Sequence, residues 1–315
     1  MDAAKLRRNY YILNKSFKKK FIFHLGSDAG FFSEYNNMIL AILYCLVNRI
    51  QFVLYSEDAN FGYNKGWRDY FLPFCDEVND NFHRKYNFRD YDFLRQRLSR
   101  KDKLKTRVYK LLNGVNFLTQ DLWLRIRDRS HEDEIYNVPE LGIINSSFRD
   151  ACRSLITMTW TYEAETGSMI KNKIESLNLP AEYIGFHIRR GDKNIEHKST
   201  GTNLYFEKIK DPDIRNIFIS TDDYNVILEV KNDLYTHWNF FSLCREDQVG
   251  YDHKQYKKLD KSRIKEEQTD LLISIDILSN SHHFIGTFSS NIGMFMGMRM
   301  GAKKSVSVDI AWQIW

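Results

Sequence analysis

Cysteine is scarce in this 315-residue sequence, with four residues, and their spacing excludes a cysteine-based zinc site. No two of them form a Cys-x-x-Cys pair, and no group of histidines and cysteines has the spacing of zinc ligands. Cys45 lies within an apolar run, which predicts a place in the core. The default location for such a chain is the reducing environment of the cytoplasm.

Long apolar runs are also missing. No stretch reaches the roughly 18 consecutive apolar residues that a membrane-spanning helix needs. The first apolar group, residues 10–13, is too short for a signal peptide, and no cleavage site follows it. We therefore expect neither a membrane span nor an export signal, and we predict a cytoplasmic protein.

Positive charge is in only slight excess, since 46 basic residues and 41 acidic ones give a net charge of +5. A dedicated nucleic-acid-binding protein usually concentrates its positive charge on one face. Here the basic residues are spread along the chain, with one denser run over residues 84–110. We interpret that run as the solvated face of a helix. The alternative is a surface that attracts an anionic acceptor, or a membrane-linked one by peripheral contact.

The length suggests two domains, and the 43% hydrophobic content is ample for their cores. In the first half, residues 21–25 predict a buried strand. A glycine-bearing loop and a helix follow, with Ser33 as the N-cap and apolar residues at helical spacing over 35–46. Residues 50–55 predict a second strand, so the three elements form a βαβ unit and imply a parallel sheet. The segment 76–154 shows no clear periodicity.

From residue 182 onward, strands and helices alternate regularly. The expected strands are 183–188, 216–220, 238–243, 283–286 and 304–309, and the expected helices are 203–210, 224–232, 265–279 and 290–300. This alternation predicts a doubly wound α/β domain, in which ligands bind at the carboxyl ends of the strands. We expect a hinge at 177–180, an N-terminal α/β domain over 1–180 and a C-terminal domain over 181–315.

Two adjacent arginines, Arg189 and Arg190, follow the strand at 183–188. Arginine suits a diphosphate, because its planar guanidinium group bonds two oxygens at once and stays charged. At the carboxyl end of a strand, one arginine should face the ligand crevice, and the other should point away and pair with a carboxylate. The alternative is a surface arginine pair at a turn made by Gly191.

A second polar cluster, residues 287–291, joins an expected strand to an expected helix. Hydroxyl groups and free backbone N–H groups at a helix N-terminus form a phosphate site. Ordinary helix capping is the alternative, and it accounts for only one of the two serines.

Asp222 and Asp223 follow the strand at 216–220. A divalent metal bound to a nucleotide sugar would call for an Asp-x-Asp pattern, whereas adjacent carboxylates diverge. We therefore expect one of the two to cap a helix and expect no metal site.

Three segments, in this order, resemble the motifs of the fucosyltransferase superfamily, which covers α1,2-, α1,6- and protein O-fucosyltransferases. They are residues 187–193 (His-Ile-Arg-Arg-Gly-Asp-Lys), 218–223 (Phe-Ile-Ser-Thr-Asp-Asp) and 287–291 (Thr-Phe-Ser-Ser-Asn). The likeness is greatest to the α1,6-fucosyltransferases, including the rhizobial nodulation enzyme. It is specific over 183–200 and 270–300 and loose over 21–79.

The resemblance implies a GT-B-like α/β enzyme with two Rossmann-like domains, of which the C-terminal one binds the nucleotide sugar and the N-terminal one the acceptor. Such an enzyme transfers L-fucose from GDP-fucose to a glycan hydroxyl, with inversion and without a metal or other cofactor. No SH3-like domain or membrane anchor of the kind found in the animal α1,6 enzymes is visible, so we expect a different acceptor.

By the same likeness, Arg189 holds the β-phosphate of the donor. An acidic residue upstream of the two serines recognises guanine in the family. Asp270 and Asp276 both lie near that place, and Ser274 occupies the aligned position. The expected substrate-binding residues are His187, Arg190, Asp270, Asp276, Ser289, Ser290 and Asn291.

An inverting transfer also needs a base that takes the proton of the acceptor hydroxyl. Glu196 follows the arginine pair on a short loop, after Lys193, and resembles the glutamate of the α1,6 enzymes, although it comes one residue sooner. The expected catalytic residues are Arg189, Lys193 and Glu196. His197 is a rival base, Asp192 is the next candidate, and a merely solvated Glu196 is the third possibility.

Other functions compete with this one. An inverting transferase with a different sugar nucleotide would need the same phosphate contacts. A nucleic-acid-binding α/β protein would be supported only by the basic run at 84–110. A non-catalytic member of the superfamily is the third alternative, and the intact motif residues speak against it. We expect a nucleotide sugar and a glycan as partners, and no nucleic acid.

Overall fold

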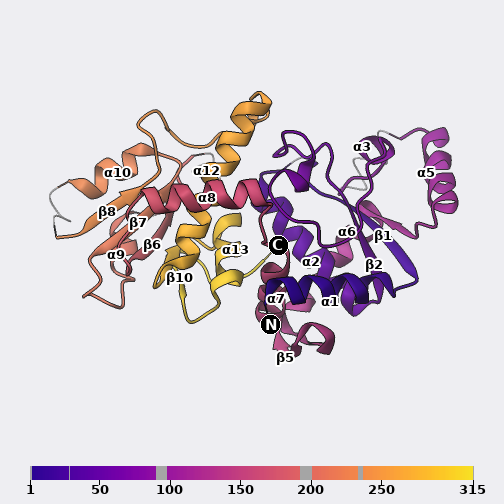
Figure 1. Ribbon diagram of the computed structural model, residues 1–315, viewed down its shortest axis with the longest axis horizontal. Helices are drawn as coiled ribbons and strands as arrows, with labels where there is room; N and C mark the ends of the chain where they lie inside the picture. The colour runs from indigo at the N-terminus through magenta and orange to yellow at the C-terminus, as the bar shows by residue number, and fades with distance from the viewer. Residues whose placement is uncertain (1, 28, 90–97, 192–200, 233–236, 315) are drawn as a thin grey trace. The chain divides into compact units, whose positions relative to one another are not determined.

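The computed structural model describes residues 2–27, 29–89, 98–191, 201–232 and 237–314 (Figure 1). The chain divides into two compact units, Met1–Glu163 and Ala164–Ile314. Each unit contains a parallel sheet with helices packed against it, so the fold class is α/β. Within the described residues, no helix is both long and apolar enough to cross a membrane.

The larger of the two sheets in the first unit has, among the described residues, three parallel strands in the order β2-β1-β3. Their bounds are Lys19–His24 for β1, Ile50–Tyr55 for β2 and Phe117–Leu118 for β3. Helix α2 (Phe31–Val47) connects β1 to β2 and is buried along almost its whole length, which is why its sequence is apolar on nearly every side. The predicted βαβ unit is confirmed, and Cys45 is buried in α2, as expected.

The start of α2 differs from the prediction. Gly30, and not Ser33, is the N-cap, and Ser33 lies inside the first turn. The reason is Glu34, whose carboxylate accepts hydrogen bonds from the backbone N–H groups of Gly26 at 3.1 Å and Ala29 at 3.0 Å. These bonds close the glycine-bearing loop against the helix and move the helix start toward the loop.

The segment 76–154, which periodicity did not assign, contains short elements joined by aromatic contacts. Phe82 stacks on Tyr109 with ring centroids 3.7 Å apart, and Tyr136 packs against Phe148 at 5.9 Å. Such clusters bury residues without a regular repeat. The remaining described elements of this unit are α1 (Ala3–Lys15), α3 (Phe82–Tyr86), α5 (Arg100–Leu112), α6 (Thr119–Ile126), β4 (Ile135–Val138), β5 (Ile143–Ser147), α7 (Phe148–Thr159) and the 3-10 helices at Gly66–Asp69, Arg129–Asp133 and Pro139–Leu141.

The sheet of the second unit has, within the described ranges, five parallel strands in the order β10-β9-β6-β7-β8. The strands are β6 (Ile184–Ile188), β7 (Asn216–Thr221), β8 (Asn239–Ser242), β9 (Phe284–Gly286) and β10 (Ser305–Ser307). The helices are α8 (Ala164–Ser176), α9 (Asn203–Phe206), α10 (Tyr224–Lys231), α11 (His253–Tyr256), α12 (Lys261–Asn280) and α13 (Asn291–Met300). All the predicted strands and helices of this region are present, with α9 shorter than expected.

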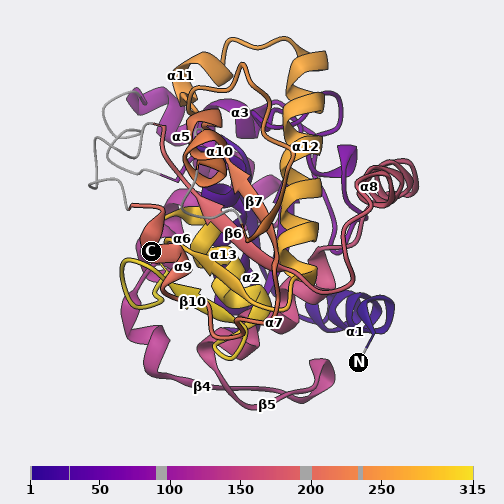
Figure 2. The same ribbon diagram turned by 90° about the vertical axis from the view of Figure 1, so that its left-hand side faces the viewer.

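The central strand β6 is covered on both faces. Ile184, Phe186 and Ile188 share a core with side chains of α9 and α10. The opposite face meets α12, since a Cβ at Gly185 would lie 2.9 Å from Leu278 Cδ2. Figure 2 shows α12 running alongside β6 and β7. This two-sided cover is the doubly wound arrangement that the sequence predicts.

The division between the units falls between Glu163 and Ala164, before the expected hinge at 177–180 and the expected boundary between 180 and 181. The reason is α8, which the sequence assigned to the N-terminal domain. It packs against α12, and Glu165 of α8 pairs with Lys265 of α12 at 3.6 Å. The residues between α8 and β6 therefore connect two elements of the same unit.

Candidate functional site

The strand order reverses direction at β6. From this central strand the chain continues to β7 and β8 on one side and then returns to β9 on the other side. His187 of β6 pairs with Gly286 of β9, so the carboxyl ends of the two strands are neighbours. In open α/β sheets, ligands bind in the crevice at such a reversal. The arginine pair follows β6 and the serine cluster follows β9, so the fold brings the two predicted motifs to one place.

Arg189 is fixed in position from two sides. Its Nη1 lies 3.1 Å from Oδ2 of Asp222, and its guanidinium carbon lies 4.8 Å from the ring centroid of Tyr251. The ring face attracts the cation, and the carboxylate orients it. With 19% of the side chain exposed, Arg189 is a partly accessible, oriented cation at the crevice.

Arg190 extends toward α10, where its Nη2 lies 3.0 Å from Oε2 of Glu229. The expectation that one arginine pairs with a carboxylate is therefore confirmed. The structure differs in that Arg189 pairs with a carboxylate as well. The reason is Asp222, which stands at the end of β7, the strand next to β6.

Asp222 organises the turn after β6. It accepts hydrogen bonds from the backbone N–H groups of Arg190 at 2.9 Å and Tyr251 at 3.0 Å. Gly191 lies so close that a Cβ there would be 2.7 Å from Oδ2 of Asp222 and 2.6 Å from the backbone of Tyr251. Only glycine fits at this position. The sequence missed this role of Asp222, although its place directly after the strand beside the arginine strand is a signal that could have indicated it.

The neighbouring carboxylate does what the sequence predicts. Asp223 is the N-cap of α10 and accepts a hydrogen bond from the backbone N–H of Asn225 at 3.0 Å. Since Asp222 binds the arginine turn and Asp223 caps the helix, the two side chains act on different parts of the chain.

His187 lies on β6 with 3% of its surface exposed. Burial, together with the nearby charge of Arg189, lowers the pKa of His187 to about 4. The imidazole is therefore neutral at physiological pH, and its Nδ1 has no hydrogen-bond partner among the described residues. A neutral imidazole next to the arginine turn does not add a third positive charge to those of Arg189 and Arg190.

The lowered pKa gives a testable pH dependence. Below pH 6.5, the ordinary pKa of histidine, the unfolded chain takes up a proton that folded His187 refuses until about pH 4. We expect this contribution to stability to be complete above pH 6.5 and to decline as the pH falls toward 4. Melting curves should show a smaller acid-induced loss for His187→Gln than for the wild type. The exposed His237→Gln serves as control, and equal losses in all three proteins would contradict the assignment.

The two serines after β9 have different partners. Ser290 is the N-cap of α13: its Oγ accepts from the backbone N–H of Gly293 at 3.0 Å and donates to the carbonyl of Thr287 at 2.8 Å. Ser289 donates its hydroxyl to Oδ2 of Asp309 at 2.5 Å. The capping alternative therefore accounts for Ser290. Asn291 is the first residue of α13, so the helix begins at the crevice with its positive end.

Asp309, which no sequence motif indicated, fixes the serine loop. Besides Ser289, its carboxylate accepts from the backbone N–H of Phe288 at 2.8 Å and from the hydroxyl of Ser307 at 2.8 Å. Burial alone would raise the pKa of Asp309, but these hydrogen bonds outweigh it and lower the pKa. The carboxylate therefore stays ionised and keeps the loop between β9 and α13 in one conformation.

The two acidic candidates for base recognition are both paired. Asp270 lies 3.0 Å from Nη1 of Arg245, which follows β8, and its side chain is 37% exposed. Asp276 lies 2.9 Å from Nη2 of Arg299, and its side chain is 14% exposed. The Asp276 pair joins α12 to α13, which is a structural role. Asp270 is the more accessible of the two.

The predicted Lys193 and Glu196, together with the rivals Asp192 and His197, lie outside the described residues. Their assignment stays a prediction from the sequence.

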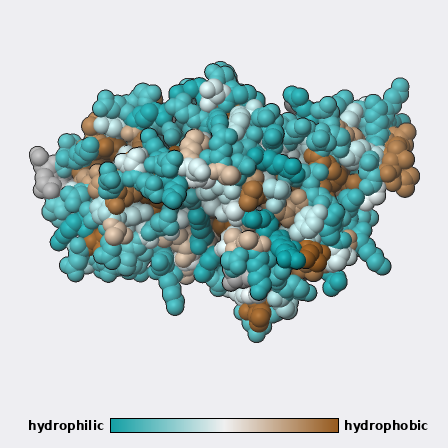
Figure 3. All heavy atoms as spheres, viewed as in Figure 1, coloured by the Kyte–Doolittle hydropathy of each residue, from teal (hydrophilic) through white to brown (hydrophobic). Residues whose placement is uncertain are grey.

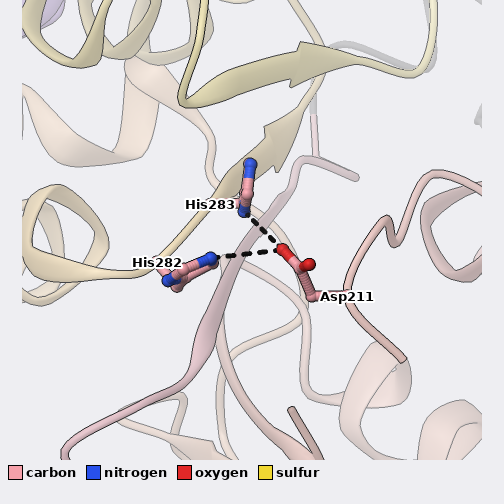
Figure 4. A group of neighbouring side chains, drawn as sticks. All are labelled: Asp211, His282 and His283. Carbon is pink, nitrogen blue, oxygen red and sulfur yellow. Dashed lines mark ion pairs between the residues drawn. The ribbon is translucent and has the colours of Figure 1, made fainter. Parts of the chain in front are cut away.

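Among the described residues, one group has the spacing of metal ligands, namely Asp211, His282 and His283 (Figure 4). Nε2 of His282 and Nδ1 of His283 lie 3.2 and 3.3 Å from Oδ2 of Asp211. The group precedes β9 and β7 in the chain, so it lies toward the amino ends of the strands, away from the crevice. Lys210 and Lys304 stand close enough to act on His283 and would repel a cation.

Comparisons with known proteins agree with this fold. Residues 152–298 match a family model described as alpha-(1,6)-fucosyltransferase N- and catalytic domains. NodZ alpha-1,6-fucosyltransferase from Bradyrhizobium, co-crystallised with GDP, is 13% identical over 90% of this chain and 92% of its own, with a TM-score of 0.51. No curated protein matches the chain.

Two further solved structures share the fold. POFUT1 in complex with GDP-fucose is 11% identical over 92% of this chain and 97% of its own, with a TM-score of 0.51. A mutant of FUT1 from Arabidopsis thaliana in complex with GDP is 12% identical over 96% of this chain and 74% of its own, with a TM-score of 0.52. At these identities the likeness concerns the fold, which is that of GT-B-like fucosyltransferases.

The α/β fold, the crevice and the family match together define the class: the protein is a glycosyltransferase of the fucosyltransferase type. More particularly, residues 152–298 are similar to the alpha-(1,6)-fucosyltransferase N- and catalytic domains. The resemblance that the three sequence motifs predict is confirmed.

Proposed function

We propose that the protein is an inverting fucosyltransferase that moves L-fucose from GDP-fucose to a glycan hydroxyl without a metal. The observation that supports this most directly is the meeting of Arg189 and the N-terminus of α13 at the carboxyl ends of β6 and β9. An oriented guanidinium group and a helix N-terminus are the two protein features that bind a diphosphate best. The solved relatives named above contain GDP or GDP-fucose.

In this proposal Arg189 binds the β-phosphate and stabilises the negative charge that develops on it as the bond to fucose breaks. The backbone at Ser290 and Asn291 contributes hydrogen bonds from the start of α13. Asp222 and Tyr251 act through Arg189, because they orient its guanidinium group before the donor arrives. We assign acceptor binding to the N-terminal unit. We also propose that the protein is located in the cytoplasm.

We expect GDP to stabilise the fold and UDP to do so less. The accessible acidic residue Asp270 is a suitable acceptor for the N–H groups of guanine. A ligand at about 100 times its dissociation constant adds about 2.7 kcal/mol to the free energy of unfolding. Thermal-shift measurements should show that Asp270→Asn reduces the GDP effect, while Asp276→Asn leaves it in place. Equal effects of GDP and UDP on the wild type would refute guanine recognition.

We also expect transfer to survive EDTA. Arg189 supplies positive charge to the leaving diphosphate in place of a cation. The adjacent carboxylates Asp222 and Asp223 are already engaged with the arginine turn and with α10. GDP release from GDP-fucose, measured with a glycan acceptor, should be the same with and without the chelator. Complete loss that manganese restores would show that the reaction needs a metal.

A further inference from the structure

Helix α5 exposes an apolar stripe. Leu104, Val108, Leu111 and Leu112 have 61, 45, 83 and 78% of their surface exposed. At about 100° per residue, these four side chains fall on one side of the helix. None of the thirteen residues of α5, all of them described, is buried. The stripe is therefore not part of the hydrophobic core, and Figure 3 shows hydrophobic side chains at the surface where Figure 1 draws α5.

The opposite side of α5 attaches the helix to its unit. The Tyr109 ring stacks on Phe82 with centroids 3.7 Å apart, and its hydroxyl donates to Asp80 at 2.8 Å. Asp102 accepts a hydrogen bond from the hydroxyl of Tyr86 at 3.1 Å. These contacts fix the orientation of α5, so the apolar stripe is directed toward solvent by the fold itself.

The net charge of α5 equals the net charge of +5 of the whole chain. It contains six basic residues and one acidic residue, whereas the full chain has 46 and 41, which leaves 40 of each for the rest. On a helical projection, basic side chains border the stripe on both sides. They are Lys105 on one side and Arg100, Lys103 and Arg107 on the other, while Lys101 lies in line with the stripe, one turn before Lys105.

A basic helix with an exposed apolar stripe fits a membrane surface. Its aliphatic side chains enter the region between headgroups and acyl chains, while lysine and arginine contact anionic headgroups. A nucleic acid would leave the four aliphatic side chains without an apolar partner. A second copy of the chain would bring a helix of the same charge against this one. Thirteen residues give a helix about 20 Å long, which lies in the interface and does not cross the bilayer.

We propose that α5 docks the protein on an anionic lipid surface. The inference does not rest on the donor or on transfer. It agrees with a glycan acceptor that is linked to a membrane lipid, because docking would bring the enzyme to the plane in which such an acceptor lies.

Vesicle co-sedimentation of the full-length protein tests the proposal. We expect binding to vesicles that contain phosphatidylglycerol, weak binding to vesicles of phosphatidylcholine alone, and a decrease at high salt. Lys101→Glu with Lys105→Glu should weaken binding at least about 25-fold, since each lysine near an anionic surface contributes about fivefold. Leu104→Ser with Leu111→Ser should weaken it by at least about tenfold per leucine.

Matched controls come from elsewhere on the surface. Lys208→Glu with Lys303→Glu lowers the net charge by the same amount at exposed sites outside α5. Leu124→Ser removes an exposed leucine of α6. Both controls should sediment with the vesicles as the wild type does. GDP binding should be unchanged in all variants, so a failure of docking can be told apart from a failure of the proposed function.

Three results would overturn the proposal. The first is no binding to anionic vesicles, or binding that the α5 variants leave unchanged. The second is self-association that the leucine variants abolish, which would make a second copy the occupant of the stripe. The third is tighter binding of duplex or single-stranded nucleic acid that depends on the same lysines.

Discussion

Replacing Arg189 by lysine is expected to lower the rate of fucosyl transfer by about 100- to 1000-fold, the usual loss when one charge-stabilising donor is removed at a developing anion. Lysine keeps the positive charge but cannot bond two phosphate oxygens in a plane. It also loses the planar contact with the Tyr251 ring and the oriented pair with Asp222. GDP release from GDP-fucose in the presence of a glycan acceptor measures the effect.

The matched control is Arg190→Lys. Arg190 contacts Glu229 on α10, whose side chain is 47% exposed, so lysine can retain an ion pair of this kind at little cost. We expect Arg190→Lys to keep most of its activity, and both variants to melt close to the wild type. If Arg189→Lys turned over normally and Arg190→Lys did not, the roles of the two arginines would have to be exchanged.

Replacing Glu196 by glutamine is expected to abolish transfer to the acceptor, with a loss of about 100- to 10,000-fold, while GDP binding stays unchanged. Glutamine keeps the shape of the side chain and removes its basicity. In an inverting reaction the base acts on the acceptor hydroxyl, on the side of the sugar opposite the diphosphate, so the contacts that bind the nucleotide are not affected. Transfer and GDP affinity are measured on the same preparation.

His197→Ala is the control for this assignment. Normal transfer by Glu196→Gln together with inactivity of His197→Ala would make His197 the base. If both variants were active, Asp192 would be the next residue to replace. In each case the affinity for GDP separates a catalytic loss from a loss of donor binding.

The order of strands and helices in the second unit was predictable because burial leaves a periodic pattern. Strands such as β6 and β7 are short apolar runs that end at polar residues, and α12 repeats its apolar residues at helical spacing. The first unit was harder, since its core consists of aromatic clusters around Trp67 and Trp160 that follow no repeat. The boundary between the two units was also not predictable from periodicity, because it depends on the packing of α8 on α12, which is a long-range contact.

The candidate site was likewise predictable only in part. The residue types alone indicated a diphosphate site at the arginine pair and at the serine cluster, because the chemistry of guanidinium groups and helix termini is local. The sequence also indicated that either Asp222 or Asp223 caps a helix.

Only the tertiary structure decided which groups act together. Hydrogen bonding between β6 and β9, far apart in the sequence, brings the arginines to the start of α13. Because β7 lies next to β6, Asp222 at the end of β7 pairs with Arg189. The loop that contains Tyr251 places the tyrosine ring against the same guanidinium group. Periodicity reports which face of an element is buried, but strand order and loop packing depend on contacts that no local pattern contains.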